Sequence, residues 1–222
     1  MHYHGPDRAD LANVFVLNTA FIAWQRTRPL GNACDSGRSP EICERLAALN
    51  LEQRERLART PFLLMSLAED DEVRWQSFFT EQQTRDLLQC VQIRDEAGSR
   101  LTAAGLGFLW QLAQRNPYAA RLVSGASLTW GEQLAMCTLM DLFTRTLEDQ
   151  ALLVPRMAGK AGLWDKLLTA GVSNRRHLRR AARVGALQTV LTNAPVRPQQ
   201  ALAAAASKMP PARIRRSGKR GQ

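Results

Sequence analysis

The stretch from Leu11 to Arg26 constrains the fold most, because its apolar side chains follow helical spacing yet surround the helix on nearly every side. A surface helix normally keeps one polar face. We therefore expect a buried helix here, either in the core of the protein or in a subunit interface. The second possibility predicts an oligomer.

Several later segments also carry apolar residues at helical spacing: residues 40–49, 50–58, 69–79, 101–114, 118–123 and 129–148. Pro40 suits a first helical position, and Thr129 with Glu132 forms a capping-box pattern that predicts one long helix to Glu148. With a hydrophobic content of 45%, a packed core is possible. The fold class we predict is mainly α, with a helical bundle-like body.

Two short segments leave alternatives open. The apolar run Phe62–Leu67 fits a strand or a buried helical turn, since periodicity cannot separate the two over so few residues. The acidic run Glu69–Glu72 could bind a cation, but acidic residues in the first turn of a helix explain it better.

Charge divides the chain unevenly. Residues 160–222 contain 14 Lys or Arg and one acidic residue, Asp165, whereas residues 1–159 contain 16 Arg and 19 Asp or Glu. Such asymmetry is typical of a basic segment that meets a polyanion. We therefore divide the chain into a helical body at 1–159, a basic unit at 160–192 and a basic tail at 193–222.

The basic unit resembles a helix-turn-helix. A short helix at 163–169 leads through Gly171 and Ser173 into a helix at 174–184, whose arginines share a broad sector. Leu178, Ala181, Ala182 and Val184 can then face the body, although His177 and Arg180 occupy positions where the usual pattern is apolar. The candidate nucleic-acid-binding residues of this helix are Arg175, Arg176, Arg179, Arg180 and Arg183.

The tail is expected to be disordered, because it is rich in Ala, Pro and Arg and loses apolar periodicity after Leu202. Arg213, Arg215 and Arg216 make it a candidate basic arm that adds salt-sensitive affinity for nucleic acid. A charged terminus without a role is the alternative.

No enzyme motif is present. The chain lacks a P-loop, G-x-S-x-G, G-x-G-x-x-G and H-E-x-x-H, and its three histidines lie at positions 2, 4 and 177. The four cysteines lack zinc-ligand spacing, so we expect no bound metal and no cofactor. We expect these cysteines to be reduced thiols in a cytoplasmic protein. We expect no membrane span, because no window of 18 consecutive apolar residues occurs.

Residues 17–65 resemble the FlhD family of bacterial transcription activators, which control flagella and, in some relatives, conjugative elements. The likeness lies in Leu17-Asn18, Ala23–Arg26, Leu46–Gln53, Leu57-Ala58 and the apolar segment Phe62–Met65. The chain departs from the family in the loop Pro29–Pro40, which looks inserted, and in the long part that follows the match. The resemblance implies a helical, oligomeric DNA-binding activator that works with a second subunit.

These observations favour a DNA-binding transcription regulator. Two other classes remain open: an adaptor whose basic end docks on an acidic protein, and an RNA-binding protein. Salt dependence separates the adaptor from the nucleic-acid-binding classes, because the affinity of a protein for phosphates falls steeply as the salt concentration rises. An enzyme is the least supported class.

Overall fold

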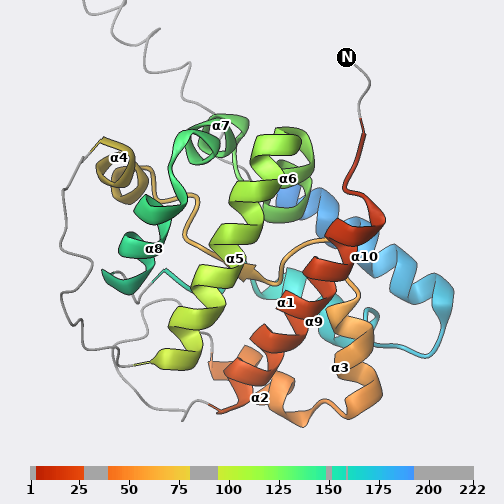
Figure 1. Cartoon of the computed structure of the whole chain (residues 1–222). Helices are drawn as coiled ribbons and strands as arrows, with labels where there is room; N and C mark the ends of the chain where they lie inside the picture. The colour runs from red at the N-terminus through yellow and green to blue at the C-terminus, as the bar shows by residue number, and fades with distance from the viewer. Residues whose placement is uncertain (1–3, 28–39, 81–94, 149–151, 159, 193–222) are drawn as a thin grey trace, which may run out of the picture.

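The computed structural model describes residues 4–27, 40–80, 95–148, 152–158 and 160–192, and within them the protein is mainly α-helical, as predicted (Figure 1). The helices are α1 (Arg8–Thr27), α2 (Pro40–Ala48), α3 (Leu51–Ala58), α4 (Glu72–Thr80), α5 (Glu96–Arg115), α6 (Pro117–Ser124), α7 (Leu128–Met136), α8 (Leu139–Glu148), α9 (Ala161–Thr169) and α10 (Arg176–Thr192). None of these helices is long and apolar enough to cross a membrane.

The helices pack around one continuous hydrophobic core. Helix α1 contacts α2, α3 and α5, whereas α5 contacts α6, α7 and α8. Helices α9 and α10 contact each other, and they join the rest through α2 and α6 respectively. The core includes Trp164 of α9 and Val190 of α10, so the basic C-terminal helices share the core of the body.

Helix α1 forms over the predicted stretch and buries one side, including Val14, Phe21 and Trp24. The opposite side is open, since Val16 is 62% exposed. Asn18 is fully buried on the inner side. Its Nδ2 donates to the carbonyls of Ala58 and Phe62 at 3.2 and 2.9 Å, and its Oδ1 accepts from the amide of Leu64 at 2.8 Å. A buried amide of this kind joins α1 to the segment after α3.

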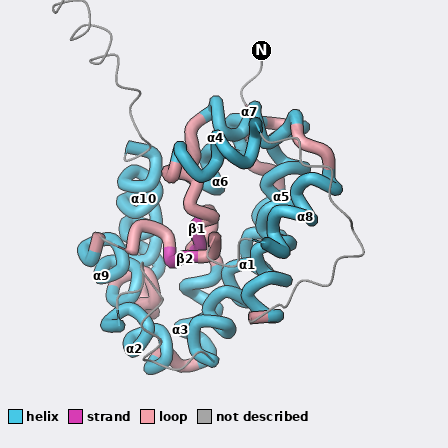
Figure 2. Tube along the Cα trace, turned by 90° about the vertical axis from the view of Figure 1, so that its left-hand side faces the viewer, coloured by secondary structure: helices cyan, strands magenta, loops and turns pink. Residues whose placement is uncertain are grey.

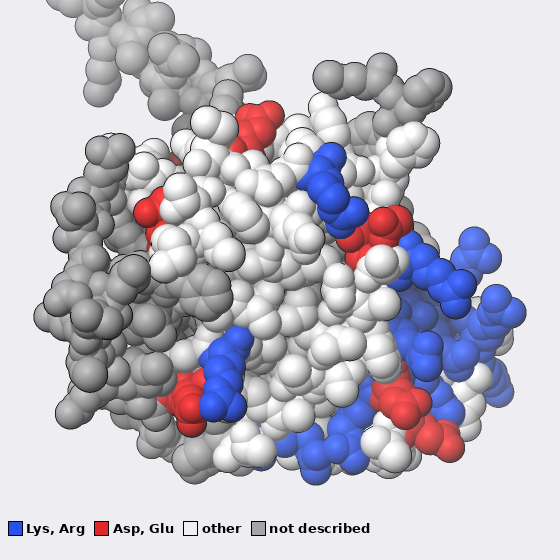
Figure 3. Space-filling view, in the orientation of Figure 1, with Lys and Arg blue, Asp and Glu red and all other residues white. Residues whose placement is uncertain are grey.

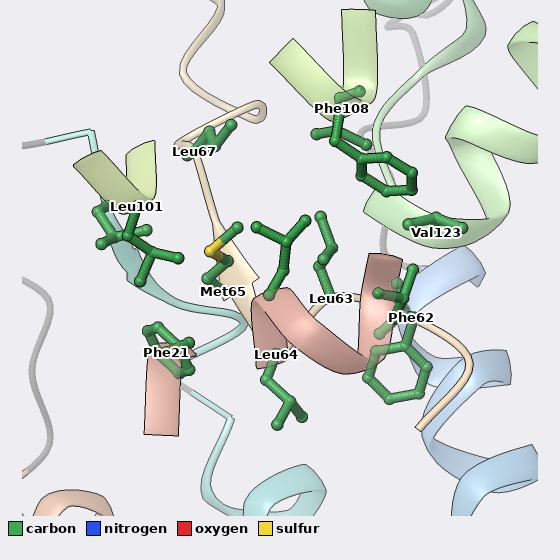
Figure 4. Close-up of a cluster of buried hydrophobic side chains, with 14 of the residues drawn as sticks. Phe21, Phe62, Leu63, Leu64, Met65, Leu67, Leu101, Phe108 and Val123 are labelled. Atoms are coloured by element: carbon green, nitrogen blue, oxygen red, sulfur yellow. The ribbon is translucent and has the colours of Figure 1, made fainter. Parts of the chain in front are cut away.

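The apolar run Phe62–Leu67 passes through the middle of the molecule and contains a short strand, β1 (Met65–Ser66). It pairs antiparallel with β2 (Val154–Pro155), so that Met65 lies opposite Pro155. Figure 2 shows this pair enclosed by helices. Figure 4 shows the run between Phe21 of α1 and Phe108 of α5, which explains why it is apolar on both faces.

Arg156 follows β2 and holds this central segment together. Its guanidinium donates to the carbonyls of Leu63 and Met65, both at 2.7 Å, and forms a buried ion pair with Glu69 at 3.1 Å. The Arg156 carbonyl accepts from Trp164 Nε1 at 2.8 Å. The first member of the acidic run is thus an interior partner of Arg156, and α4 begins three residues later, at Glu72.

The predicted single helix over 129–148 is two helices. Ser127, two residues before the predicted cap, accepts from the amide of Trp130 at 3.1 Å, and α7 ends at Met136. The extended backbone of Cys137 then interrupts the helix, and Asp141 accepts from the amide of Thr138 at 3.0 Å at the start of α8. Side-chain capping inside an apolar helical pattern therefore breaks the helix where periodicity alone continues it.

Candidate nucleic-acid interface

The turn between α9 and α10 is tight because of Gly171. A Cβ at this position would lie 2.4 Å from the carbonyl oxygen of Leu167, closer than any side chain allows. The amide of Gly171 donates to the Lys166 carbonyl at 3.0 Å, which closes the end of α9. Glycine therefore lets the chain turn directly over the last turn of α9 and into α10.

Helix α10 is longer than predicted and runs to Thr192. Its buried stripe is Ala182, Ala186 and Val190, spaced four residues apart. Val190 lies against Gly125, which ends α6 with a φ of 71°; a Cβ there would lie 2.3 Å from Val190 Cγ1. This close approach seats the C-terminal half of α10 on α6 and extends the helix past Val184.

Because α10 packs through this stripe, the residues that face the solvent differ from those predicted from the sequence. Of the four residues predicted to face the body, only Ala182 does so, whereas Leu178 and Val184 are 37% and 50% exposed. Ala181 is also exposed. The contact face therefore differs from the predicted one, because α6 and α9 together determine which stripe is covered.

The five candidate arginines of α10 separate into two sets. Arg175, Arg176 and Arg180 are exposed. Arg179 and Arg183 turn toward the protein and bind its backbone: Arg179 Nη1 donates to the carbonyls of Ser173 and Asn174 at 2.7 and 2.8 Å. Arg183 Nη2 donates to the carbonyl of Arg56 at 2.6 Å.

Helix α3 supplies further arginines that the sequence reasoning did not select. Arg56 donates to the carbonyl of Val172 at 3.3 Å and to the Asn174 side chain, while it pairs with Glu52 at 2.6 Å. Arg59 is exposed, with its guanidinium 5.0 Å from the ring centre of Phe15. The available signal was the run of three arginines within residues 54–59, which the net negative charge of the body concealed.

These side chains form one surface, which we call the arginine face: Arg56 of α3 and Arg59 directly after this helix, with Arg175, Arg176, Arg179, Arg180 and Arg183 at α10. Figure 3 shows Lys and Arg side chains gathered on the right of the molecule, where Figure 1 shows α3 and α10. Acidic residues are few within it; Glu52 pairs with Arg56, and Glu55 is exposed nearby.

Positive charge is crowded within the arginine face. The pKa of Arg183 is lowered, first by burial and then by repulsion from Arg179 and Arg59. An arginine stays charged at neutral pH despite such a shift. Crowded like charges create a positive potential that an approaching anion relieves.

The helix-turn-helix likeness has two departures whose environment is now clear. His177 and Arg180, which occupy positions that are apolar in the usual pattern, are both exposed. The contact between α9 and α10 therefore does not need apolar residues at these positions. The tail arginines Arg213, Arg215 and Arg216 lie outside the described residues.

The described ranges contain no group of three or more His, Cys, Asp or Glu side chains that could hold a metal ion. Comparisons with protein-family models, with curated protein sequences and with solved structures find no match to this chain. The candidate site therefore rests on the arginine face.

Proposed function

We propose that this protein binds nucleic acid through the arginine face and acts as a DNA-binding transcription regulator. One observation carries the proposal: α3 and α10, far apart in sequence, present arginines on one surface, and Arg183 is crowded by Arg179 and Arg59. Arginines grouped in this way neutralise phosphates and release condensed counterions, which supplies sequence-independent affinity.

The regulatory part of the proposal has a different support. Residues 17–65 resemble the FlhD family of transcription activators, and this segment includes α3. We propose accordingly that the protein works in the cytoplasm as an oligomer or with a second subunit. Exposed apolar side chains away from the arginine face, such as Val73 of α4 and Met136 of α7, are available for such a contact.

The test is fluorescence-anisotropy binding of the full chain to random-sequence duplex DNA over a salt series. We expect the logarithm of the affinity to fall linearly and steeply with the logarithm of salt concentration. The double charge reversal Arg176→Glu/Arg180→Glu should abolish binding. The control Arg74→Glu/Arg100→Glu changes the net charge equally on α4 and α5 and should bind almost as well as the unchanged protein.

Four outcomes contradict the proposal. Equal losses from both double reversals mean that net charge alone attracts DNA. Unchanged binding by the Arg176→Glu/Arg180→Glu variant moves the interface elsewhere. A chain that ignores DNA but binds an acidic protein with little dependence on salt is an adaptor, and a clear preference for structured RNA makes it an RNA-binding protein.

A further inference from the structure

The outermost line of α10 contains no Lys, Arg, Asp or Glu. His177, Ala181, Val184 and Gln188 are all exposed, and their spacing of four, three and four residues places them in one stripe. This stripe lies opposite the buried stripe formed by Ala182, Ala186 and Val190. An exposed helix face usually carries Lys, Arg, Asp or Glu side chains, so their absence from a stripe beside so many arginines indicates a specific role.

The arginines of α10 lie to one side of this outer stripe. At 3.6 residues per turn, Arg176, Arg180 and Arg183 fall in the sector between the outer stripe and α3, whereas Arg179 lies nearer the buried stripe. The opposite flank holds Leu178, Gly185 and Thr192, which are uncharged. The helix therefore presents the exposed Arg176 and Arg180 along one edge, and side chains other than Lys, Arg, Asp and Glu along its crest.

This division suits a helix in the major groove of duplex DNA. The groove is wide enough to admit an α-helix, and a phosphate strand runs along its edge. From residue 177 to residue 188 the stripe spans about 16 Å, which is the length of about five base pairs. We propose that His177, Ala181, Val184 and Gln188 read base edges there, while the arginine face holds the phosphates of the adjacent strand.

The side chains indicate what is read. Gln188 can make paired hydrogen bonds to adenine, Ala181 and Val184 can contact the thymine methyl group, and His177 can donate or accept at a base edge. The stripe thus favours a site that contains A·T pairs. A-form RNA is a poor ligand for it, because the major groove of A-form RNA is too narrow and deep for side chains to read.

This inference rests on the proposed function and is tested separately from it. The full chain selects binding sequences from a duplex pool with a randomised central segment. The same selection is run with the stripe variant His177→Ala/Val184→Ser/Gln188→Ala and with the control Gln133→Ala/Met140→Ala, which changes exposed residues of α7 and α8. Anisotropy with unselected duplex measures non-specific affinity for each protein, and circular dichroism verifies that each is folded.

We expect the unchanged protein and the control to enrich the same short motif with A·T pairs. The stripe variant should lose that motif and its preference of about tenfold or more over unselected duplex, yet keep its non-specific affinity and salt slope. Gln188→Ala alone should relax the choice at one adenine.

Each remaining outcome decides against the inference. Duplex binding with a steep salt slope but no enriched motif leaves the proposed function standing and removes base reading. A motif unchanged in the stripe variant places the reading elsewhere. Tighter binding to an RNA hairpin than to duplex excludes major-groove reading, and failure to bind any nucleic acid overturns the proposed function together with the inference.

Discussion

The guanidinium of Arg183 donates a 2.6 Å hydrogen bond to the backbone carbonyl of Arg56, two residues before the end of α3. Hydrogen bonds also run in the opposite direction: the guanidinium of Arg56 donates to the carbonyl of Val172 and to the side chain of Asn174, both in the turn before α10. A cation near the C-terminal end of α3 also suits the helix dipole. These reciprocal bonds hold the two helices of the arginine face together.

Arg183 and Arg180 should differ in their contributions to folding stability and to DNA binding. Arg183→Met removes a charge-assisted hydrogen bond, but it also relieves burial and repulsion, so we expect unfolding free energy to fall by only about 1 kcal/mol. Arg180→Met changes an exposed residue and should alter stability by less than about 0.5 kcal/mol, while it lowers the salt slope of DNA binding by about 1. Urea unfolding measures the stability changes, and fluorescence anisotropy measures the salt slope. A stability loss that is larger in Arg180→Met than in Arg183→Met would contradict the structure.

Helix α3 should contribute to binding. Arg59→Gln removes one exposed guanidinium, so the salt slope for random duplex DNA should fall by about 1. The lost contact with Phe15 should cost about 0.5–1 kcal/mol in stability. Arg100→Gln, on α5 beyond the arginine face, is the matched control and should leave the slope unchanged. An unaltered slope in Arg59→Gln would restrict the interface to α10.

Two glycine substitutions should have opposite effects. Gly125→Ala introduces a Cβ 2.3 Å from Val190 Cγ1 at a φ of 71°, so it should lower unfolding free energy by about 2 kcal/mol. Gly107 lies within α5 with no neighbouring atom within 4 Å of its Cβ position. Gly107→Ala should therefore raise stability by about 0.5–1 kcal/mol. Thermal and urea unfolding measure both, and equal effects would show that α10 does not pack on α6 as described.

Removing Arg156 should be the most destabilising of these changes. Arg156→Met leaves Glu69 as a buried charge without its cation, which costs about 3–5 kcal/mol. The double variant Arg156→Met/Glu69→Leu removes both charges and should recover part of the loss, although the carbonyls of Leu63 and Met65 stay without this donor. Arg100→Met, at an exposed position, is the control. If urea unfolding shows no recovery in the double variant, the ion pair is not the source of the loss.

Local chemistry allowed much of the helical structure to be predicted. The start of α3 at Asn50 is an example: the Asn50 side chain accepts from the backbone amide of Gln53 at 2.9 Å, and the Gln53 side chain accepts from the backbone amide of Asn50 at 3.0 Å. Asn116 and Pro117 likewise mark the change from α5 to α6. Such signals act within one turn of helix, so they can be read directly from neighbouring residues.

The partners of charged side chains could not be predicted in this way. The local pattern places Glu69 in a first helical turn, but its partner Arg156 lies 87 residues away. The same pattern groups Arg179 and Arg183 with the other arginines of the basic helix, although both bind backbone carbonyls of the protein. A charged residue has the same local pattern whether its partner is solvent, a phosphate or the protein interior.

By itself, the sequence determined that the protein is mainly helical, where several helices begin and end, and that positive charge accumulates toward its C-terminus. These properties depend on hydrophobic spacing, capping and composition, which act over a few residues. Only the tertiary structure decided which stripe of α10 is buried, and it brought the arginines of α3 beside those of α10. Both depend on the packing of α10 against α6, α9 and α3, and such long-range contacts leave no local pattern in the residues that make them.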